Sequence, residues 1–370
     1  MKKQIILLSA LVLMYSCQTE EPISQENAML TSSALPLDED IQDSNSKRPI
    51  WKFNSSMQAS STFGITDGWG NFTLKRVADV NGDGRADIIG FGINDTFVAL
   101  GSSNGTFGSP ILASTTFAYN DSWGFKSRHV SDVNGDGRAD IIGFGNDATF
   151  VALGNSNGTF STPIFANSNF GSSDGWQIYP KTVKDVNGDG RADIVGFGSD
   201  DTVVAFGQAN GTFSTPFTAS TNYGSNDTWQ GKRREIADVN SDGRGDIVAY
   251  GNGGVWISLA TTNGTFSTSF MVLPGHFHDR HFDFEPVRIA DINGDNNMDI
   301  ISLERDFVYL YYGEGDGNFT SPRVRAYDRF TYDAGWLSEH IRYVSDVNGD
   351  NKADIIGFGE NATIVSLSID

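Results

Sequence analysis

The stretch DVNGDGRADIIGFG, residues 79–92, decides the fold because it recurs at a fixed interval along the chain. Counterparts of its first aspartate stand at Asp132, Asp185, Asp238, Asp291 and Asp346, and the successive spacings are 53, 53, 53, 53 and 55 residues. Six such units fill residues 51–370 and leave no room for a second domain. A repeat of this length, built from short strands, is typical of β-propeller blades.

Each unit has the pattern of four short strands separated by turns. In the first unit, residues 74–79 (LKRVAD) lead into the Asp-rich loop, and residues 86–92 (ADIIGFG) follow it. Residues 96–101 (TFVALG) come next, and an Asn-Gly turn separates them from residues 107–115 (FGSPILAST). Asn-Gly between such segments is a strong hairpin signal. The sequence therefore predicts an all-β, six-bladed β-propeller of four-stranded blades, with a stacked solenoid as the runner-up.

The two ends of the repeat region complement each other. The last unit stops at residues 363–370 (TIVSLSID) without a fourth strand, whereas residues 51–64 precede the first unit without strands to pair with. We expect residues 51–64 to supply the missing strand of the sixth blade, which would close the ring and remove an exposed edge. A seven-bladed ring is the alternative, and it would need a unit that the sequence does not display.

The N-terminal region predicts export and a lipid anchor. Residues 1–16 combine Lys2 and Lys3 with an apolar stretch, and Cys17, the only cysteine of the chain, follows directly. This resembles a bacterial lipoprotein signal peptide, with lipidation of Cys17 after cleavage. Residues 17–50 are polar and predict a flexible tether. We expect an outer-membrane lipoprotein exposed at the cell surface, since the acidic residues after Cys17 resemble a surface-export signal of Bacteroidota; ordinary secretion is the alternative.

The charge of the chain restricts its partners. The formal net charge is −20, which speaks against nucleic acid and against direct binding to an anionic membrane surface. A membrane contact is therefore expected through the lipid anchor only.

The Asp-rich loops predict calcium sites. Positions 1, 3, 5 and 9 of each loop carry side-chain oxygens, and position 7 offers a backbone carbonyl, which together suit Ca²⁺. Position 12 is not a glutamate and a strand-like segment follows, so the loop is not an EF-hand. We expect about six structural Ca²⁺ ions (Ca2+). The predicted ligands are Asp79, Asn81, Asp83, Arg85, Asp87, Asp132, Asn134, Asp136, Arg138, Asp140, Asp185, Asn187, Asp189, Arg191, Asp193, Asp238, Asn240, Asp242, Arg244, Asp246, Asp291, Asn293, Asp295, Asn297, Asp299, Asp346, Asn348, Asp350, Lys352 and Asp354.

The loop followed by an NGTF turn resembles the FG-GAP or VCBS repeat family, which also forms the propellers of integrin α chains. The segment FGSSDGW before the third loop makes the chain similar to the calcium-containing propeller lectins typified by the Psathyrella velutina lectin. This resemblance implies several glycan sites between adjacent blades, and hence multivalent binding. Those lectins are usually seven-bladed, so six units are a departure.

An aromatic residue, usually tryptophan, stands about ten residues before each loop, often with an acid just before it. Such pairs suit sugar binding, because an indole ring stacks on the C–H face of a sugar beside polar groups. The candidate sugar-binding residues are Trp69, Trp123, Trp176, Trp229, Trp336, Asp67, Asp121, Asp174, Asp227 and Asp333. The alternative is that each tryptophan plugs the gap between two blades. A cation four residues before most loops, such as Lys75 or Arg128, is interpreted as structural. Because the loops join strands 1 and 2 of a blade and the tryptophans lie in the links between blades, the two should occupy opposite faces of the ring.

The fifth unit departs from this pattern, with PGHFHDRHFDFEP at residues 274–286 in place of the tryptophan segment. His276, His278 and His281 could form a transition-metal or catalytic site, but a drifted repeat is the favoured interpretation.

Three classes of function follow. The sequence favours a surface-tethered, non-catalytic, lectin-like propeller that binds glycans, because equivalent sites repeat around the ring. An integrin-like adhesion or scaffold propeller that binds a protein partner is the alternative. A polysaccharide-degrading enzyme is the weakest hypothesis, because catalysis requires an asymmetric set of residues and no catalytic residue stands out.

Overall fold

The structure, a computed structural model, describes residues 52–70, 73–226, 229–251, 253–275, 286–321, 323–327, 329–337 and 340–369. These residues belong to one unit, Glu39–Asp370. The predicted signal peptide at 1–16, Cys17 and the tether at 17–50 lie outside the described residues. Within the described residues, no helix has the length and apolar character needed to cross a membrane.

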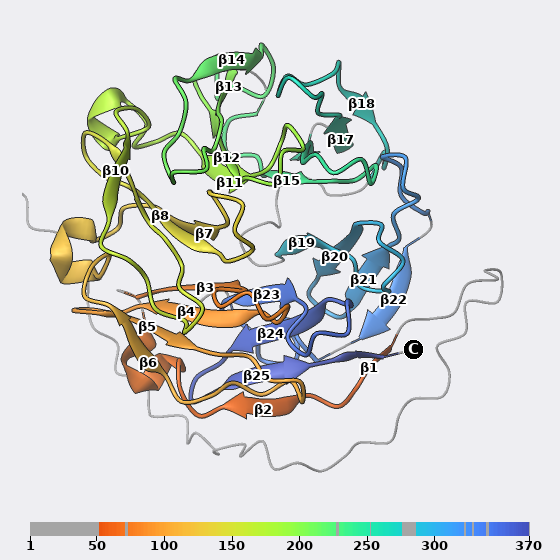
Figure 1. Cartoon of the computed structure of the whole chain (residues 1–370). Helices are drawn as coiled ribbons and strands as arrows, with labels where there is room; N and C mark the ends of the chain where they lie inside the picture. The colour runs from red at the N-terminus through yellow and green to blue at the C-terminus, as the bar shows by residue number, and fades with distance from the viewer. Residues whose placement is uncertain are drawn as a thin grey trace, which may run out of the picture. The chain divides into compact units, whose positions relative to one another are not determined.

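Six four-stranded antiparallel sheets are arranged in a ring, as Figure 1 shows. This confirms the predicted six-bladed propeller. In five of the sheets the strands pair in sequence order, with the first strand innermost and the fourth outermost, and in the sixth sheet β2 from the N-terminal segment takes the outermost place. The first three blades are formed by β3 (Leu74–Ala78), β4 (Asp87–Phe91), β5 (Thr96–Ala99) and β6 (Ile111–Ser114); β7 (Arg128–Ser131), β8 (Asp140–Phe144), β9 (Thr149–Ala152) and β10 (Ile164–Asn167); and β11 (Lys181–Lys184), β12 (Asp193–Phe197), β13 (Thr202–Ala205) and β14 (Phe217–Ser220).

The other three blades follow the same plan. They are formed by β15 (Arg234–Ala237), β16 (Asp246–Gly251), β17 (Gly254–Ser258) and β18 (Phe270–Met271); β19 (Val287–Ala290), β20 (Asp299–Leu303), β21 (Val308–Tyr311) and β22 (Val324–Tyr327); and β23 (Arg342–Ser345), β24 (Asp354–Phe358), β25 (Thr363–Ser366) and β2 (Met57–Ser60). Among the described residues, three of the links between blades contain a short helical turn: η1 (Ile65–Trp69), η2 (Tyr119–Trp123) and η3 (Ser172–Asp174).

The N-terminal segment closes the ring, as predicted. Strand β2 pairs antiparallel with β25, with Met57 opposite Val365. The segment also makes a contact that the sequence did not predict: β1 (Lys52–Phe53) pairs with β26 (Ser368–Ile369) to form a separate two-stranded sheet. Asn54 joins the two pairings, because its N–H donates to the Leu367 carbonyl at 2.9 Å and its side-chain oxygen accepts from the Leu367 N–H at 2.9 Å.

The core lies between neighbouring blades. The second strand of every blade is buried along its whole length, which explains why its sequence is a continuous apolar run rather than an alternating one. Ile89 and Val98 of the first blade, for example, pack in one cluster with Ile141 and Ala152 of the second. Each blade therefore buries its apolar residues against the next blade around the ring.

The Asp loops and the links lie on opposite faces of the ring, as predicted, because each inner strand begins at a link and ends at a loop. On the loop face, Arg85 Nε donates to the carbonyl of Gly101, two residues after the third strand ends, at 3.1 Å. On the link face, the N–H of Tyr119 donates to the carbonyl of Gly92, in the turn between strands 2 and 3 of the first blade, at 2.9 Å. Each link is thus fixed to the preceding blade.

Candidate functional site

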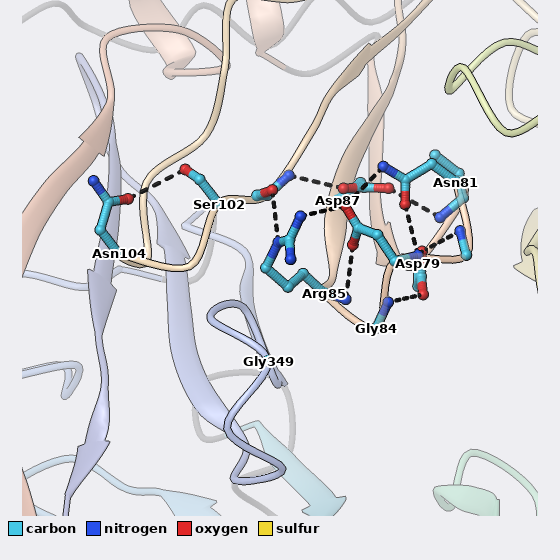
Figure 2. Close-up of polar contacts among 12 residues, drawn as sticks. Asp79, Asn81, Gly84, Arg85, Asp87, Ser102, Asn104 and Gly349 are labelled. Carbon is cyan, nitrogen blue, oxygen red and sulfur yellow. Dashed lines mark hydrogen bonds and ion pairs between the residues drawn. The ribbon is translucent and has the colours of Figure 1, made fainter.

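The Asp loops are curled around their first aspartate. Asp79 Oδ1 accepts the N–H of Gly82 and Asp79 Oδ2 that of Gly84, both at 2.7 Å, as the close-up in Figure 2 shows. Asn81 Oδ1 accepts the N–H of Asp83 at 3.0 Å. Side-chain oxygens thus satisfy the backbone N–H groups that this tight turn leaves without backbone partners.

The aspartate at position 9 is the most buried member of the loop. Asp87 is fully buried, and its two carboxylate oxygens accept the N–H groups of Val80 at 3.0 Å and Gly101 at 2.8 Å. The pKa of Asp87 is raised to about 7, mainly by burial and in part by the charges of Asp83 and Asp79, while the two hydrogen bonds act in the opposite direction. The position-9 aspartates of the other five loops share this burial and this pKa.

The aspartate at position 5 faces an arginine. Asp83 Oδ2 and Arg85 Nη2 form an ion pair at 2.5 Å, and the corresponding pairs recur in the second, third and fourth loops. Within the described residues, no three acidic side chains converge as a ready-made metal site. The loop nevertheless fits Ca²⁺ in donor type and charge, because the carboxylates of Asp79 and Asp83 lie near enough to Asp87 to contribute to its raised pKa. A calcium ion would have to draw Asp83 away from Arg85.

The loops are also interlocked around the ring. The carbonyl of Asp79 accepts the N–H of Ala139, in the loop of the next blade, at 2.8 Å. The same bond joins four other pairs of loops: Asp346 with Ala86, Asp132 with Ala192, Asp185 with Gly245, and Asp291 with Ala353. Between the fourth and fifth loops, Ser241 Oγ donates instead to the carbonyl of Asn296 at 3.1 Å. The loop face is thus a continuous hydrogen-bonded rim.

The tryptophans of the links pack at the blade interfaces. Trp123 lies 4.7 Å from Phe117 and 6.2 Å from Phe150, measured between ring centroids. It covers Gly143 so closely that a Cβ there would come within 2.4 Å of the indole ring. Trp69, Trp176 and Trp336 cover the corresponding glycines of their blades in the same way, and Trp229 is only 7% exposed. The tryptophans therefore fill the gap between blades, and four of the five rings remain partly exposed.

The cations before the loops hold the links in place. Arg128 is buried, and its Nη1 and Nη2 donate to the carbonyls of Phe117 at 2.8 Å and Gly124 at 2.9 Å. Its guanidinium also lies 5.3 Å from the centre of the Phe91 ring on the preceding blade. Lys75, Lys181 and Arg234 make the equivalent contacts with Phe358, Phe144 and Phe197. This agrees with their structural interpretation.

The candidate acids of the links are exposed where they are described. Asp121 Oδ2 accepts the N–H of Phe117 at 3.2 Å, and Asp174 Oδ2 accepts that of Gly171 at 3.3 Å. Asp333 pairs with Arg305 at 3.0 Å. Asp67 is exposed as well, and Asp227 lies outside the described residues. So do His276, His278 and His281 of the fifth unit.

Two exposed apolar side chains of the links escaped the sequence analysis. Phe125 is 80% exposed and Ile178 is 79% exposed, and each follows its tryptophan by two residues. Phe125 makes an edge contact with Tyr119 at 5.4 Å between ring centroids. The signal that could have found them is that this position differs among the five units that have the tryptophan, while the tryptophan before it repeats.

The repeat pattern of a known family matches most of the propeller. The FG-GAP-like repeat aligns with residues 79–142, 185–249, 238–302 and 291–357. The chain belongs to the FG-GAP-like repeat family. Each stretch begins at an Asp loop, continues through the rest of that blade and ends in the second strand of the next blade. The matched stretches of this FG-GAP-like protein therefore include the loops that bond to one another around the ring.

Solved structures relate the FG-GAP-like propeller to a lectin. A lectin from Agrocybe aegerita, described as recognising non-reducing terminal N-acetylglucosamine, is 30% identical; the match covers 82% of this chain and 79% of the lectin, with a TM-score of 0.66. The Tc holotoxin pore of Photorhabdus luminescens is 15% identical over 87% of this chain and 15% of its own, with a TM-score of 0.57, and shows the fold alone. No curated protein sequence matches the chain.

Proposed function

We propose that this FG-GAP-like propeller is a non-catalytic, lectin-like protein that binds glycans on its link face. The observation that carries the proposal is its similarity to the Agrocybe aegerita lectin, which extends over most of both chains. Terminal N-acetylglucosamine is therefore the sugar to test first. Equivalent links around the ring would allow multivalent binding, in which several weak contacts add to one strong attachment.

The links of the second and third blades are the best placed to bind a sugar. Each combines a partly exposed tryptophan with an exposed acid and a highly exposed apolar side chain, Phe125 in one link and Ile178 in the other. The tryptophans are engaged with the sheet below them, so we assign the main stacking contact to Phe125 and the apolar side chain of Ile178. In both links the acid, Asp121 or Asp174, offers carboxylate oxygens to sugar hydroxyls.

We further propose that each Asp loop holds one structural Ca²⁺ ion, bound by the oxygens of positions 1, 3, 5, 7 and 9. The fully buried aspartate at position 9 supports this, because a cation would offset the cost of burying its charge beside two other carboxylates. When bound, calcium neutralises the carboxylates and braces the loop. Because the loops lie on the face opposite the links, calcium would act on glycan binding through stability alone.

For localisation, we propose a lipoprotein of the bacterial outer membrane, displayed at the cell surface through Cys17. Radiolabelled palmitate should be incorporated into the wild-type chain and not into Cys17→Ser. Protease added to intact cells should remove the propeller. Label in both chains, or protection from the protease, would contradict the anchor or its surface exposure respectively.

The glycan proposal is tested by an array probed with residues 18–370 in calcium. We expect binding to glycans that end in N-acetylglucosamine. In Phe125→Ala and Ile178→Ala, binding should weaken about tenfold, because each variant loses roughly 1.4 kcal/mol of apolar contact. Leu112→Ala, on an outer strand, is the matched control and should bind as the wild type does. The absence of glycan binding by a folded, calcium-loaded chain would contradict the proposal.

One observation favours a protein partner as the second candidate. The neighbouring outer strands β6 and β10 expose Leu112 at 53% and Phe165 at 60%, and exposed apolar side chains often mark protein interfaces. If the array is negative, the double variant Leu112→Ser, Phe165→Ser should lose the attachment of cells to a protein-coated surface. Attachment that survives both serines would exclude this candidate.

A further inference from the structure

One position of the inner strands breaks the repeat. The residue three positions before each loop is of five different types in the six units, arginine alone occurring twice, although the residues around it are largely repeated. These residues are Arg76, His129, Thr182, Glu235, Arg288 and Tyr343. They stand at the same register on the six inner strands β3, β7, β11, β15, β19 and β23, which Figure 1 shows around the centre of the ring. The ring thus carries an asymmetric polar set at its axis.

The arginines of this set lie over the free edges of the inner strands. The carbonyl of Ser127 accepts the N–H of Phe144 in the second strand of its blade. Because alternate residues of an antiparallel strand face the same partner, the carbonyl of the next residue, Arg128, faces away from that strand and toward the axis. Arg76 Nε donates to this carbonyl at 3.1 Å. Arg288 Nε donates likewise to the carbonyl of Arg342 at 2.9 Å.

Tyr343 connects the two arginines. Its hydroxyl donates to the carbonyl of Lys75 at 2.7 Å and accepts from Arg76 Nη1 at 3.1 Å. The guanidinium of Arg288 lies 5.8 Å from the centre of the Tyr343 ring. Strand β23 contacts both β19 and β3. Three adjacent inner strands therefore gather two guanidinium groups around one phenol.

Neither guanidinium forms an ion pair with an acidic side chain among the described residues, although the charge of Glu235 acts on Arg288 against the burial that lowers the pKa of this arginine. Arg76 and Arg288 donate to backbone carbonyls and to Tyr343, and the acidic member of the set, Glu235, pairs with Arg233. Lys184 lies two residues after Thr182, on the same side of its strand, and is exposed. Desolvation by the surrounding protein lowers the pKa of Lys184. The guanidinium groups of Arg76 and Arg288 thus make the centre of the ring locally positive in a chain with a net charge of −20.

The pKa of His129, on the inner strand next to that of Arg76, is affected by the same positive charges. Burial lowers the pKa of His129 to about 3, with further contributions from the charges of Arg76 and Lys181. The His129 side chain is therefore neutral at physiological pH.

We propose that the ring axis binds a small oxyanion, such as sulfate or phosphate, between Arg76 and Arg288, with Lys184 adding to the attraction. Guanidinium groups recognise such anions through parallel N–H donors. A purely structural role as staples between inner strands accounts for the bonds to backbone carbonyls. It leaves unexplained why Lys184, which has no polar contact to a described residue, adds a further positive charge at the axis.

The proposal is tested by titrating sulfate into the wild-type chain in calcium, using isothermal calorimetry at constant ionic strength. We expect saturable binding of about one sulfate per ring. The double variant Arg288→Gln, Lys184→Met should bind at least about tenfold more weakly, because it loses charge-assisted contacts. Lys126→Met, on the link face, is the matched control and should bind sulfate as the wild type does.

Lys184→Met alone keeps the proposal testable if Arg288→Gln does not fold, because Lys184 makes no polar contact that the fold would lose. It should weaken sulfate binding measurably while leaving the melting temperature in chloride unchanged. In crystals grown with selenate, anomalous density should lie at the axis, near Arg76 and Arg288. A wild-type chain without saturable sulfate or phosphate binding would overturn the proposal, and so would variants that bind as tightly as the wild type.

Discussion

The Asp-loop face and the link face are built from the same six units, yet they differ in what the units keep. On the loop face, the aspartates repeat in every blade, and their carbonyls join one loop to the next at five of the six junctions. On the link face, the tryptophan repeats in most blades, but the side chains that project from the link do not, as Phe125 and Ile178 show. Repeated residues thus build the ring, and variable residues distinguish one blade from another.

Removal of calcium should have the largest effect on stability, because it acts on all six repeated loops of the loop face at once. If each site is filled at ten times its Kd, six sites add roughly 8 kcal/mol to the free energy of unfolding. Scanning calorimetry in calcium and in EDTA should show a large fall in the melting temperature, while magnesium at equal concentration restores little of it. Equal melting temperatures with and without calcium would show that the arginine–aspartate pairs alone stabilise the loops.

The repeated part of a link should matter next most. In Gly143→Ala, the added methyl would overlap the Trp123 ring, and overpacking of this kind costs about 1–3 kcal/mol. Urea denaturation should show this loss of stability. Gly124→Ala, whose added Cβ meets no atom within 4 Å but whose φ is +42°, is the control for backbone strain in the same link. Equal stability of Gly143→Ala and the wild type would mean that the tryptophan can leave the blade freely.

His129, at the variable position of the inner strands, should have a smaller effect on stability, and this effect should be seen only at acidic pH. The folded-state pKa of His129 is about 3, below the unfolded value of about 6.5. Stability from the neutral ring is therefore complete above pH 6.5 and is lost as the pH falls toward 3, by about 2 kcal/mol at pH 5. His129→Gln should lose less stability than the wild type between pH 7 and pH 5 in urea denaturation. Parallel pH profiles for the two chains would contradict the lowered pKa.

A variable link position should give the smallest effect, and of opposite sign. Ser122 has φ of 65°, where three other links have glycine before the tryptophan: Gly68, Gly175 and Gly335. Replacing Ser122 with glycine removes left-handed strain and should stabilise the chain by up to about 1 kcal/mol. A rise of a few degrees in the melting temperature would confirm it. A fall would mean that the added freedom of glycine in the unfolded chain outweighs the strain.

Most of the fold could be predicted from the sequence because the repeat is strict. The period fixed the number of blades, and the unmatched segments at the two ends predicted the closure. The β1–β26 pair could not be predicted, because strands of two residues carry no periodicity. In the links, a repeated tryptophan predicts packing and stacking equally well. The structure shows the packing, because Trp123 lies so close to Gly143 that a Cβ there would come within 2.4 Å of the indole ring.

The candidate site was less predictable because its informative residues are those that depart from the repeat. Alignment of the units directs attention to what they share, and so selects residues such as Arg128 that hold the links together. Phe125 and Arg288 become visible only when the positions that differ are compared. Their surroundings also depend on neighbouring blades, about one repeat apart in sequence. Arg76, for example, donates to a carbonyl 52 residues away.

The closing of the sixth blade also sets an order in time. Asn54, which leaves the ribosome early, bonds to Leu367, 313 residues later in the chain. At roughly 5–20 residues per second, synthesis of the intervening segment takes about 15–60 seconds. During that interval β2 has no strand to join, and β25 does not yet exist. The ring can therefore be completed only after its last blade has been made, and a chain interrupted before β25 would keep an open edge that other chains could pair with.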